Sequence, residues 1–289
     1  MRQYFLSRFL SQTCGTWKLK EEFMLKLAVV GKDVSKSESG KMHAFILRGM
    51  GSDCEYEHIS VAAEKFDALA EKLLAEKDAF NVTIPYKLSV IPHLNSLEGD
   101  AKIFGAVNTV KDRIGYNTDG AGFMLMLQNN GIETSGRRFL VLGAGGAGRS
   151  VVKKLADAGA HVFLYDMNVQ NAEIVATEFG NIRPLTSLQP AQYDVIVNAT
   201  GVGMHKSEGV SPVGAEFLSR CNLACDLIYC PKKSEFLRIA EGLGKKILNG
   251  EGMLFYQAYY ADCIYLGKDA DSDEAKTLFE RYQREKENA

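Results

Sequence analysis

The chain has 289 residues, of which 46% are hydrophobic and 24% are charged, so it is long enough for two domains with buried cores. Its formal net charge of −2 argues against the broad positive field that attracts nucleic acid or anionic lipid. A run of about eighteen apolar residues, the length of a transmembrane helix, is absent from the sequence. We therefore expect a cytoplasmic protein that binds neither nucleic acid nor membrane.

Residues 1–23 differ from the rest of the chain. They are rich in Arg, Ser, Phe and Leu and contain no acidic residue before Glu21, a composition with some likeness to a transit peptide. An upstream start codon or a disordered leader explains the segment more simply, because Met24 opens a clear strand. We prefer this second interpretation and place residues 1–23 outside the folded domains.

From Leu25 onward, short apolar runs alternate with helical periodicity, which predicts an α/β fold with a mostly parallel sheet. A first unit contains strands at 25–30, 55–60 and 80–84, helices at 39–50 and 61–75, and a β-hairpin over 104–118 with its turn at 111–115. A second unit begins near Phe139. It contains strands at 139–142, 161–166, 195–198 and 223–228, and helices at 147–158, 253–265 and 273–286.

A glycine-rich loop joins the first strand and helix of the second unit. Gly143 permits a tight turn, Gly145 lets the backbone approach a pyrophosphate, and Gly148 lets the helix pack closely on the strand. The start of the following helix offers free N–H groups and partial positive charge to phosphates. The segment Gly143-Ala144-Gly145-Gly146-Ala147 therefore predicts a dinucleotide site, although such a turn can also occur without a ligand.

The residue at the end of the next strand bears on the choice of cofactor. Asp166 lies about twenty positions after Gly143, the offset expected of an acid that binds the adenosine ribose. A carboxylate there accepts hydrogen bonds from a 2′-hydroxyl and repels a 2′-phosphate, and no basic residue follows at Met167 or Asn168. This pattern favours NAD over NADP.

Cys221, Cys225 and Cys230 cluster in the sequence and raise the question of a metal site. The cluster has no paired CxxC and no neighbouring histidine to complete a tetrahedral set of ligands. We therefore predict buried thiols and no metal.

Two further segments place an ionisable group among small polar residues at strand ends, where α/β enzymes bind ligands. They are Asn81-Val-Thr-Ile-Pro-Tyr-Lys87 and Gly115-Tyr-Asn-Thr-Asp-Gly120. Oxidation of an alcohol requires a base for the hydroxyl proton, and a lysine held by an aspartate can serve. By themselves, a lysine and an aspartate such as Lys87 and Asp119 are far more often a surface ion pair than a catalytic pair.

These segments belong to an ordered series that resembles the shikimate dehydrogenase family, which includes quinate/shikimate dehydrogenases, over essentially all of 25–267. Residues 31–39 with Met42-His43 are similar to its GxPIxHSxSP…H motif, and 81–87 to its NVTxPxK motif. Residues 105–109 and 115–119 match GAxNT and GxNTD. The blocks around Asn198-Ala-Thr200, Asp226 with Tyr229 and Pro231, and 250–254 with Gln257 follow in the family's order.

The resemblance implies reversible hydride transfer between shikimate and a nicotinamide, with 3-dehydroshikimate as the ketone. It implies that Lys87 is the acid/base group and Asp119 its partner. The remaining residues implied to contact substrate are Ser37, Ser39, Thr83, Asn108 and Gln257. The residues implied to contact the cofactor are Gly143, Ala144, Gly145, Gly146, Ala147, Asp166, Thr200, Leu227, Tyr229 and Gly250.

The family fold implies two domains around a cleft. The N-terminal substrate-binding domain comprises 24–123 and 250–289, so that the C-terminal helices return to it. A Rossmann-type, doubly wound nucleotide-binding domain comprises 124–249. We expect a monomer or a homodimer that acts on a small hydroxy acid of the shikimate or quinate type.

The chain departs from the family pattern at several positions. Asp33 and Gly40 replace prolines, Lys36 replaces a histidine, and Met167 replaces the arginine common in members that use NADP. Gly201-Val-Gly203 replaces Pro-Leu-Gly. These changes leave open an NAD-preferring quinate or quinate/shikimate dehydrogenase. Another class, a dinucleotide-binding metabolite sensor without catalysis, is disfavoured because a sensor needs neither Lys87 nor Asp119.

Overall fold

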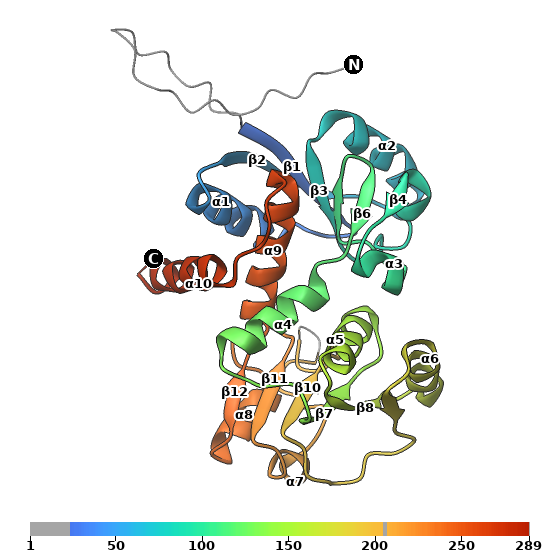
Figure 1. Cartoon of the computed structure of the whole chain (residues 1–289), viewed down its shortest axis with the longest axis vertical. Helices are drawn as coiled ribbons and strands as arrows, with labels where there is room; N and C mark the ends of the chain where they lie inside the picture. The colour runs from blue at the N-terminus through green and yellow to red at the C-terminus, as the bar shows by residue number, and fades with distance from the viewer. Residues whose placement is uncertain (1–23, 205–206, 289) are drawn as a thin grey trace, which may run out of the picture.

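The computed structural model describes residues 24–204 and 207–288, so the predicted leader at 1–23 lies outside the described residues. The strands form two six-stranded sheets, which lie in the upper and lower halves of Figure 1. Within the described residues, no helix is long and apolar enough to cross a membrane. The α/β class and the two-sheet organisation predicted from the sequence are confirmed.

The first sheet has the strand order β2-β1-β3-β5-β6-β4. Strand β1 pairs in parallel with β2 and β3, β5 pairs antiparallel with β3 and β6, and β4 lies parallel to β6. The strand bounds are β1 Met24–Gly31, β2 Asp53–Ser60, β3 Ala79–Val82, β4 Ser96–Leu97, β5 Thr109–Lys111 and β6 Ile114–Tyr116. The predicted hairpin is formed by β5 and β6, and its turn residues Asp112 and Arg113 both have positive φ, as a two-residue type I′ turn requires.

Short helices connect these strands. They are α1 Ser39–Gly49, the 3₁₀ turn η1 Ala63–Lys65, α2 Phe66–Glu76, the 3₁₀ turn η2 Ile91–His93 and α3 Asp100–Phe104. The helix predicted at 61–75 begins at Phe66, after the 3₁₀ turn. The strand predicted at 80–84 ends at Val82, so Thr83 to Lys87 belong to the connection that follows the C-terminal end of β3.

The second sheet is parallel throughout, in the order β12-β11-β10-β7-β8-β9. Its strands are β7 Arg138–Leu142, β8 His161–Tyr165, β9 Ile182–Pro184, β10 Val195–Asn198, β11 Leu223–Asp226 and β12 Lys246–Leu248, and its helices are α5 Gly146–Asp157, α6 Val169–Phe179, α7 Ala215–Leu218 and α8 Glu235–Gly242. Along β7, Phe139 and Val141 belong to one buried cluster, and Leu140 and Leu142 to another. Helices therefore cover both faces, which is the doubly wound arrangement.

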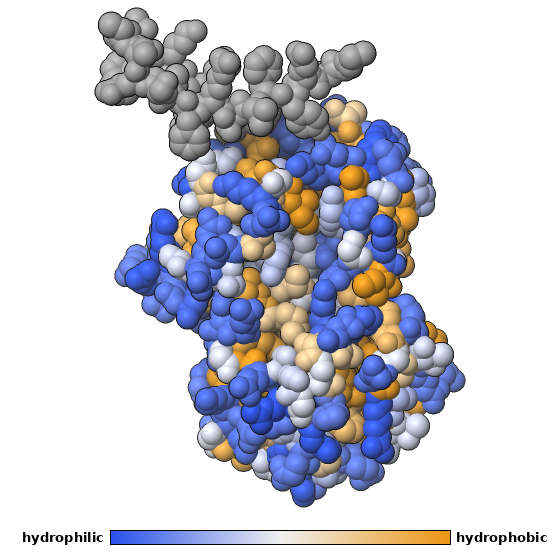
Figure 2. Space-filling view, viewed as in Figure 1, coloured by the Kyte–Doolittle hydropathy of each residue, from blue (hydrophilic) through white to orange (hydrophobic). Residues whose placement is uncertain are grey.

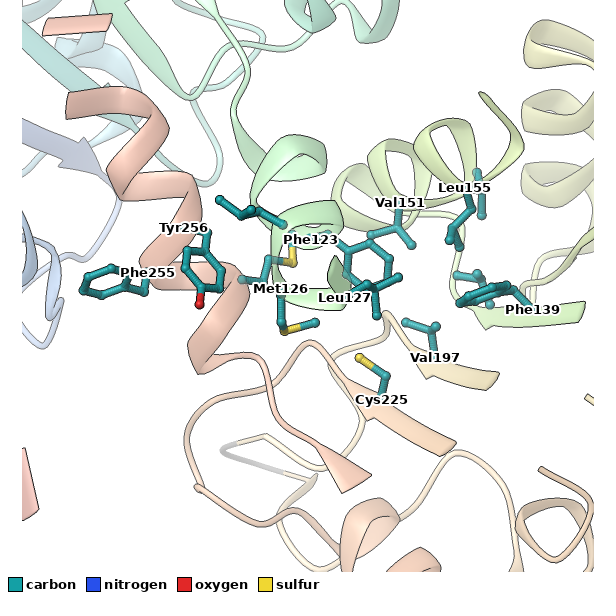
Figure 3. Packing of buried hydrophobic residues seen from close by; sticks show 14 of the residues in the cluster. Phe123, Met126, Leu127, Phe139, Val151, Leu155, Val197, Cys225, Phe255 and Tyr256 are labelled. Carbon is teal, nitrogen blue, oxygen red and sulfur yellow. The ribbon is translucent and has the colours of Figure 1, made fainter. Parts of the chain in front are cut away.

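Helices α4 Asp119–Asn129 and α9 Glu251–Leu266 lie between the two sheets, and α10 Ser272–Glu287 packs on α9, α1 and α4. A buried cluster runs from α9 and α4 to the second sheet, as Figure 3 shows for Phe255, Phe123 and Phe139. Near its other end α9 packs Ala261 and Tyr265 against Leu25 and Leu27 of β1. The C-terminal helices thus return to the first sheet, as expected (Figure 1). The predicted domain boundary at 123/124 falls inside α4, and the division into domains stays a prediction.

Candidate active site

A cavity of about 260 Å³ lies between the two sheets. Figure 2 shows less polar residues exposed at the waist of the molecule, between the two halves. The first half contributes Val29, Ser39, Asn81, Val82, Thr83, Lys87, Asn108 and Asp119, the second contributes Ala147, Leu227, Tyr229 and Gly250, and α9 contributes Met253, Leu254 and Gln257. Both halves therefore supply residues that the sequence singled out.

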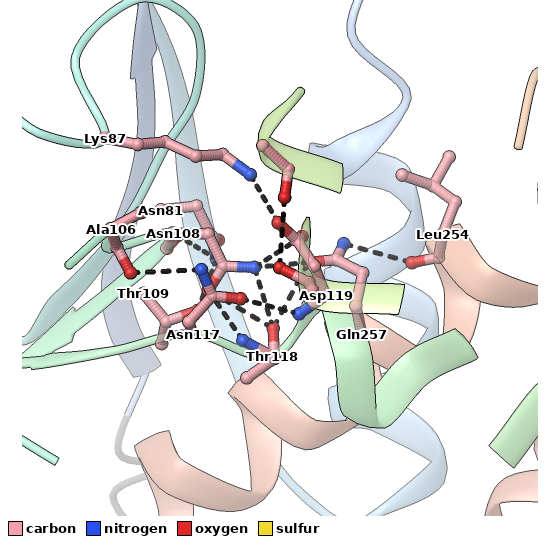
Figure 4. A network of polar contacts seen from close by, with 12 residues as sticks. Asn81, Lys87, Ala106, Asn108, Thr109, Asn117, Thr118, Asp119, Leu254 and Gln257 are labelled. Atoms are coloured by element: carbon pink, nitrogen blue, oxygen red, sulfur yellow. Dashed lines mark hydrogen bonds and ion pairs between the residues drawn. The ribbon is translucent and has the colours of Figure 1, made fainter. Parts of the chain in front are cut away.

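Lys87 and Asp119 form an ion pair in the lining of this cavity. The Lys87 Nζ donates to Asp119 Oδ2 at 2.6 Å, and both side chains are mostly buried (Figure 4). Lys87 follows β3, whereas Asp119 is the first residue of α4, where the helix dipole stabilises a carboxylate. The pair is therefore part of an interior site, which removes the alternative of an exposed surface ion pair.

The Asn108 side chain is the centre of the polar network. Its Nδ2 lies 2.8 Å from Asp119 Oδ1, 3.0 Å from Thr118 Oγ1 and 3.3 Å from Gln257 Oε1. Its Oδ1 accepts from Thr109 Oγ1 at 2.9 Å and from the Thr118 backbone N–H at 3.0 Å. Asn108 thus holds the second carboxylate oxygen of Asp119 while Lys87 holds the first, and the carboxylate has a fixed orientation (Figure 4).

Asn81 begins the segment 81–87 and is a residue of the site that the sequence alone did not identify. Asn81 lines the cavity, and its Nδ2 lies 3.4 Å from both Asn108 O and Thr109 Oγ1. Its Oδ1 accepts a hydrogen bond from the Tyr56 hydroxyl at 2.7 Å. The available signal was its position at the end of a buried strand, where polar residues of α/β proteins meet ligands.

The serines predicted to bind substrate lie at the start of α1. Ser39 lines the cavity, and the Ser37 hydroxyl donates to Ser39 Oγ at 2.9 Å. The Ser39 N–H donates to Ser37 Oγ at 3.2 Å. Gly40, which stands where relatives have proline, directs its N–H toward His58 Nε2 at 3.4 Å, and a proline has no N–H to do so.

The glycine-rich loop has the geometry that its spacing predicts. Gly143 has φ of +102°, and a Cβ on Gly148 would lie 2.0 Å from Gly143 O, so neither position accepts a side chain. Cβ atoms on Gly145 and Gly146 would meet nothing within 4 Å, so the backbone of this turn is open to a ligand at the start of α5. These features fit the pyrophosphate of a dinucleotide.

Asp166 stabilises the glycine-rich loop through hydrogen bonds. Its Oδ2 accepts from the Ala144 N–H at 2.8 Å, and its Oδ1 accepts from the Asn168 N–H at 2.9 Å and lies 3.3 Å from Asn171 Nδ2. The carboxylate thus connects β8 to the glycine loop and the start of α6. These contacts give Asp166 a structural role in the loop that requires no ribose hydroxyl.

The other predicted cofactor contacts lie where β10, β11 and β12 end. Leu227, Tyr229 and Gly250 line the cavity, and a Cβ on Gly250 would lie 2.0 Å from Leu227 O. Thr200 is not among the cavity-lining residues; its hydroxyl donates to Asn198 Oδ1 at 2.6 Å, beside the glycine loop.

Asn198 connects these strand ends to a buried acid. Its Nδ2 donates to Asp226 Oδ1 at 3.0 Å. Burial raises the pKa of Asp226, and hydrogen bonds from Ser234, the Ile228 N–H and Asn198 partly oppose this.

The cysteine cluster is buried only in part. Cys221 and Cys225 are buried, but Cys230 is exposed. The prediction that all three are buried thiols is therefore wrong for Cys230, because β11 ends at Asp226 and Cys230 lies in the connection beyond it.

Comparison with known proteins finds shikimate dehydrogenases among both the sequence relatives and the solved structures. Residues 29–110 match the model described as the shikimate dehydrogenase substrate binding domain. The chain is 38% identical over 251 residues to a shikimate dehydrogenase (NADP(+)) of Thermus thermophilus, which covers 84% of this chain and 93% of that one. It is 34% identical over 279 residues to the enzyme of the same name from Syntrophomonas wolfei, covering 90% and 94%.

Solved structures agree with the sequence relatives. The Thermus thermophilus shikimate 5-dehydrogenase, solved in complex with NADP(H) and shikimate, superposes with a TM-score of 0.80 at 35% identity. The match covers 89% of this chain and 99% of that one.

These relatives correct the cofactor prediction. They are named for NADP(+), and the solved relative holds NADP(H), so the preference for NAD inferred from Asp166 is wrong. The physical reason is that both carboxylate oxygens of Asp166 are engaged by the protein itself. The offset of Asp166 from Gly143 therefore does not by itself identify a carboxylate that binds the ribose.

Proposed function

Because the chain belongs to the shikimate dehydrogenase family, we propose that it catalyses the reversible, NADP-dependent reduction of 3-dehydroshikimate to shikimate. The observation that supports this most directly is the Lys87–Asp119 pair, 2.6 Å apart in the cavity between the two sheets. A hydroxyl placed against both groups has a proton acceptor and a second hydrogen-bond partner on the same side.

In the direction of oxidation, the uncharged Lys87 amine takes the proton from the substrate hydroxyl. In reduction, the ammonium returns that proton to the forming alkoxide. Asp119 aligns the lysine by accepting a hydrogen bond from its Nζ, and Asn108 keeps the carboxylate from rotating. A nicotinamide held beside this cavity would supply the hydride acceptor in oxidation and the hydride donor in reduction.

The rest of the cavity is suited to a small polyhydroxylated acid. Ser37 and Ser39 would donate to the substrate carboxylate, and Thr83, Asn108 and Gln257 would contact ring hydroxyls. Neutral donors suffice for a single carboxylate, because hydrogen bonds to an ionised group are stronger than those between neutral groups. Asn81 would complete the set of polar groups on this side of the cavity.

The cofactor would be held by the second half of the molecule. Gly143, Ala144, Gly145, Gly146 and Ala147 would receive the pyrophosphate at the start of α5. Thr200, Leu227, Tyr229 and Gly250 would border the nicotinamide end, because three of these four also line the substrate cavity. Asp166 would act indirectly, by fixing the backbone of Ala144.

The proposal is tested by assaying purified protein with shikimate or quinate and with NADP or NAD, following reduced cofactor by absorbance. We expect turnover with shikimate and NADP. A higher kcat/KM with quinate would favour the quinate/shikimate alternative, and no turnover in any combination would overturn the proposed activity. The cytoplasmic location and the monomeric or homodimeric state stay predictions.

The assigned role of Lys87 is tested by Lys87→Ala. General acid–base groups contribute about 10²–10⁴-fold, so kcat should fall by this factor in an otherwise folded protein. Lys72→Ala is the matched control, because Lys72 forms an exposed ion pair with Glu76 on α2. If Lys87→Ala keeps wild-type turnover, the proposed mechanism is wrong.

A further inference from the structure

A buried acid–base pair lies behind the cavity and takes no part in the proposed chemistry. The His43 Nδ1 lies 2.6 Å from Asp262 Oδ1, and the two side chains are 1% and 0% exposed. His43 belongs to α1 and Asp262 to α9, so the pair joins the first helix of the described chain to the helix before the last. Its position indicates a contact that sets how these helices meet.

Each helix also carries a residue of the cavity. Ser39 precedes His43 by four positions on α1, which places the two side chains on the same face of that helix. Gln257 precedes Asp262 on α9 and lines the cavity with Ser39. A contact that fixes α1 on α9 therefore also fixes the separation of Ser39 and Gln257.

Tyr56 connects this pair to a third cavity residue. Its ring stacks on the His43 imidazole, with centroids 5.0 Å apart and planes 16° apart. Its hydroxyl donates to Asn81 Oδ1 at 2.7 Å. Burial and the nearby Asp262 carboxylate raise the pKa of Tyr56 well above its usual value, so the hydroxyl keeps the proton that it donates.

We propose that the His43–Asp262 pair and Tyr56 form a positioning unit that holds Ser39 and Asn81 in place for substrate. The proposal rests on the function proposed above, and the three residues act without touching substrate or cofactor. Removal of the Tyr56 hydroxyl leaves the Asn81 amide held only by the two 3.4 Å contacts of its Nδ2. Disruption of the pair lets α1 shift on α9 and moves Ser39.

The effect of this unit should fall on substrate binding. Tyr56→Phe keeps the ring stack and removes one hydrogen bond, whose loss corresponds to about a three- to tenfold increase in the KM for shikimate. The KM for NADP should stay within about twofold of wild type, because the glycine loop lies in the other half of the molecule. The kcat should also change little, because Lys87 and Asp119 keep their own contacts.

The experiment compares Tyr56→Phe, Asp262→Asn and the double variant by steady-state kinetics and thermal melting. Tyr259→Phe is the matched control. Tyr259 belongs to α9, as Asp262 does, but its hydroxyl donates to Glu274 on α10 and not toward the cavity. We expect both single variants to raise the KM for shikimate, and the double variant to exceed the larger single effect by less than twofold. The control should lower the melting temperature without raising this KM.

The outcomes separate the inference from the proposed function. Wild-type protein without shikimate turnover would overturn the function and, with it, this inference. Active wild type with an unchanged KM in Tyr56→Phe would overturn the positioning unit alone. If Asp262→Asn does not fold, Tyr56→Phe still decides, because it retains the buried pair. A KM increase in Tyr259→Phe equal to that in Tyr56→Phe would reduce the effect to general stability and overturn the inference.

Discussion

Gly122 on α4 lies so close to Gln257 on α9 that a Cβ built on Gly122 would be 2.6 Å from the Gln257 backbone nitrogen. The same Cβ would lie 2.8 Å from Met253 O. Backbone atoms cannot move aside as a flexible side chain can, so this contact requires glycine. Asp119 lies three residues before Gly122 on α4, and both Asp119 and Gln257 accept hydrogen bonds from the Asn108 Nδ2. The contact at Gly122 therefore also fixes the distance between Asp119 and Gln257.

Gly122→Ala should therefore reduce both stability and catalysis. The added methyl group has to separate α4 from α9, and overpacking of this kind typically costs about 1–3 kcal/mol. Because the separation moves Gln257 away from Asp119, kcat/KM for shikimate should fall more than the loss of folded protein explains. Urea unfolding together with steady-state kinetics measures both effects.

Gly242→Ala is the control for this substitution. Gly242 ends α8, and a Cβ there would meet nothing within 4 Å. Helical Gly→Ala changes without a clash stabilise by about 0.4–1 kcal/mol, so this variant should be as stable as wild type or more so. Equal stability of the Gly122 and Gly242 variants would show that α4 and α9 tolerate separation.

Asp262 should make the stability of the protein fall as pH rises from about 4 to about 6. Burial raises the pKa of Asp262 from 3.8 to about 6, and His43 opposes this only in part. In this window the folded state holds a proton that the unfolded chain has released, so the free energy of unfolding decreases with pH. The contribution is fully present below about pH 4 and is lost above about pH 6, on the order of 3 kcal/mol.

The measurement is the free energy of unfolding of wild type and Asp262→Asn across this pH range. The variant lacks the titrating carboxyl group, so its stability relative to wild type should rise between pH 4 and pH 6. The exposed Asp269 provides the control, because Asp269→Asn should leave the wild-type pH dependence in place. A constant difference between wild type and Asp262→Asn would contradict the prediction.

The predictable parts of the fold are those with local signals. The connection from β7 through the glycine loop to α5 was predicted within a residue or two, because an apolar run, fixed glycine spacing and a helical pattern follow one another. Helix α4 was not predicted. It contains Gly120 and Gly122, and its run from Phe123 to Leu127 shows no amphipathic period because neighbouring elements bury the helix on most sides.

The same distinction applies to the site. Lys87 and Asp119 were predicted from segments in family order, and the fold brings them together. The function of Asp166 depended on which N–H groups the folded loop directs toward it, and its sequence offset does not encode that. The His43–Asp262 pair joins residues 219 positions apart, and no local pattern connects them.

Cys230 should be the most reactive of the described cysteines. It is exposed, whereas burial raises the pKa of Cys221 and Cys263 to about 11 each and that of Cys54 to about 12. Only the thiolate reacts readily, so iodoacetamide at pH 8 should modify Cys230 first. Mass spectrometry of tryptic peptides from the native protein measures the order of labelling.

Bound cofactor should slow the labelling of Cys230. Its neighbour Tyr229 lines the cavity, so a nicotinamide held there restricts access to the thiol. Denatured protein is the control and should label at every cysteine alike. Faster labelling of Cys221 or Cys263 than of Cys230 in the native protein would contradict the burial seen in the structure.

Ser234 should contribute to stability in two ways at once. Its hydroxyl donates to Asp226 Oδ2, and its Oγ accepts from the Leu237 N–H at 3.4 Å as the N-cap of α8. Ser234→Ala leaves a completely buried carboxylate without this donor, which costs about 1–3 kcal/mol, and removes the cap, which costs about 0.5–2 kcal/mol. We therefore expect a loss of about 2–4 kcal/mol in urea unfolding.

Ser219→Ala separates this effect from the general consequence of losing a serine hydroxyl. Ser219 is exposed at the end of α7, and its hydroxyl donates to the Glu216 carbonyl. Its loss should change the free energy of unfolding by less than about 0.5 kcal/mol. Ser234→Thr keeps both the donor and the acceptor, so it should recover part of the stability that alanine loses. If Ser234→Ala were as stable as Ser219→Ala, the Asp226 carboxylate would not depend on Ser234, and Asn198 and the Ile228 N–H would suffice to hold it.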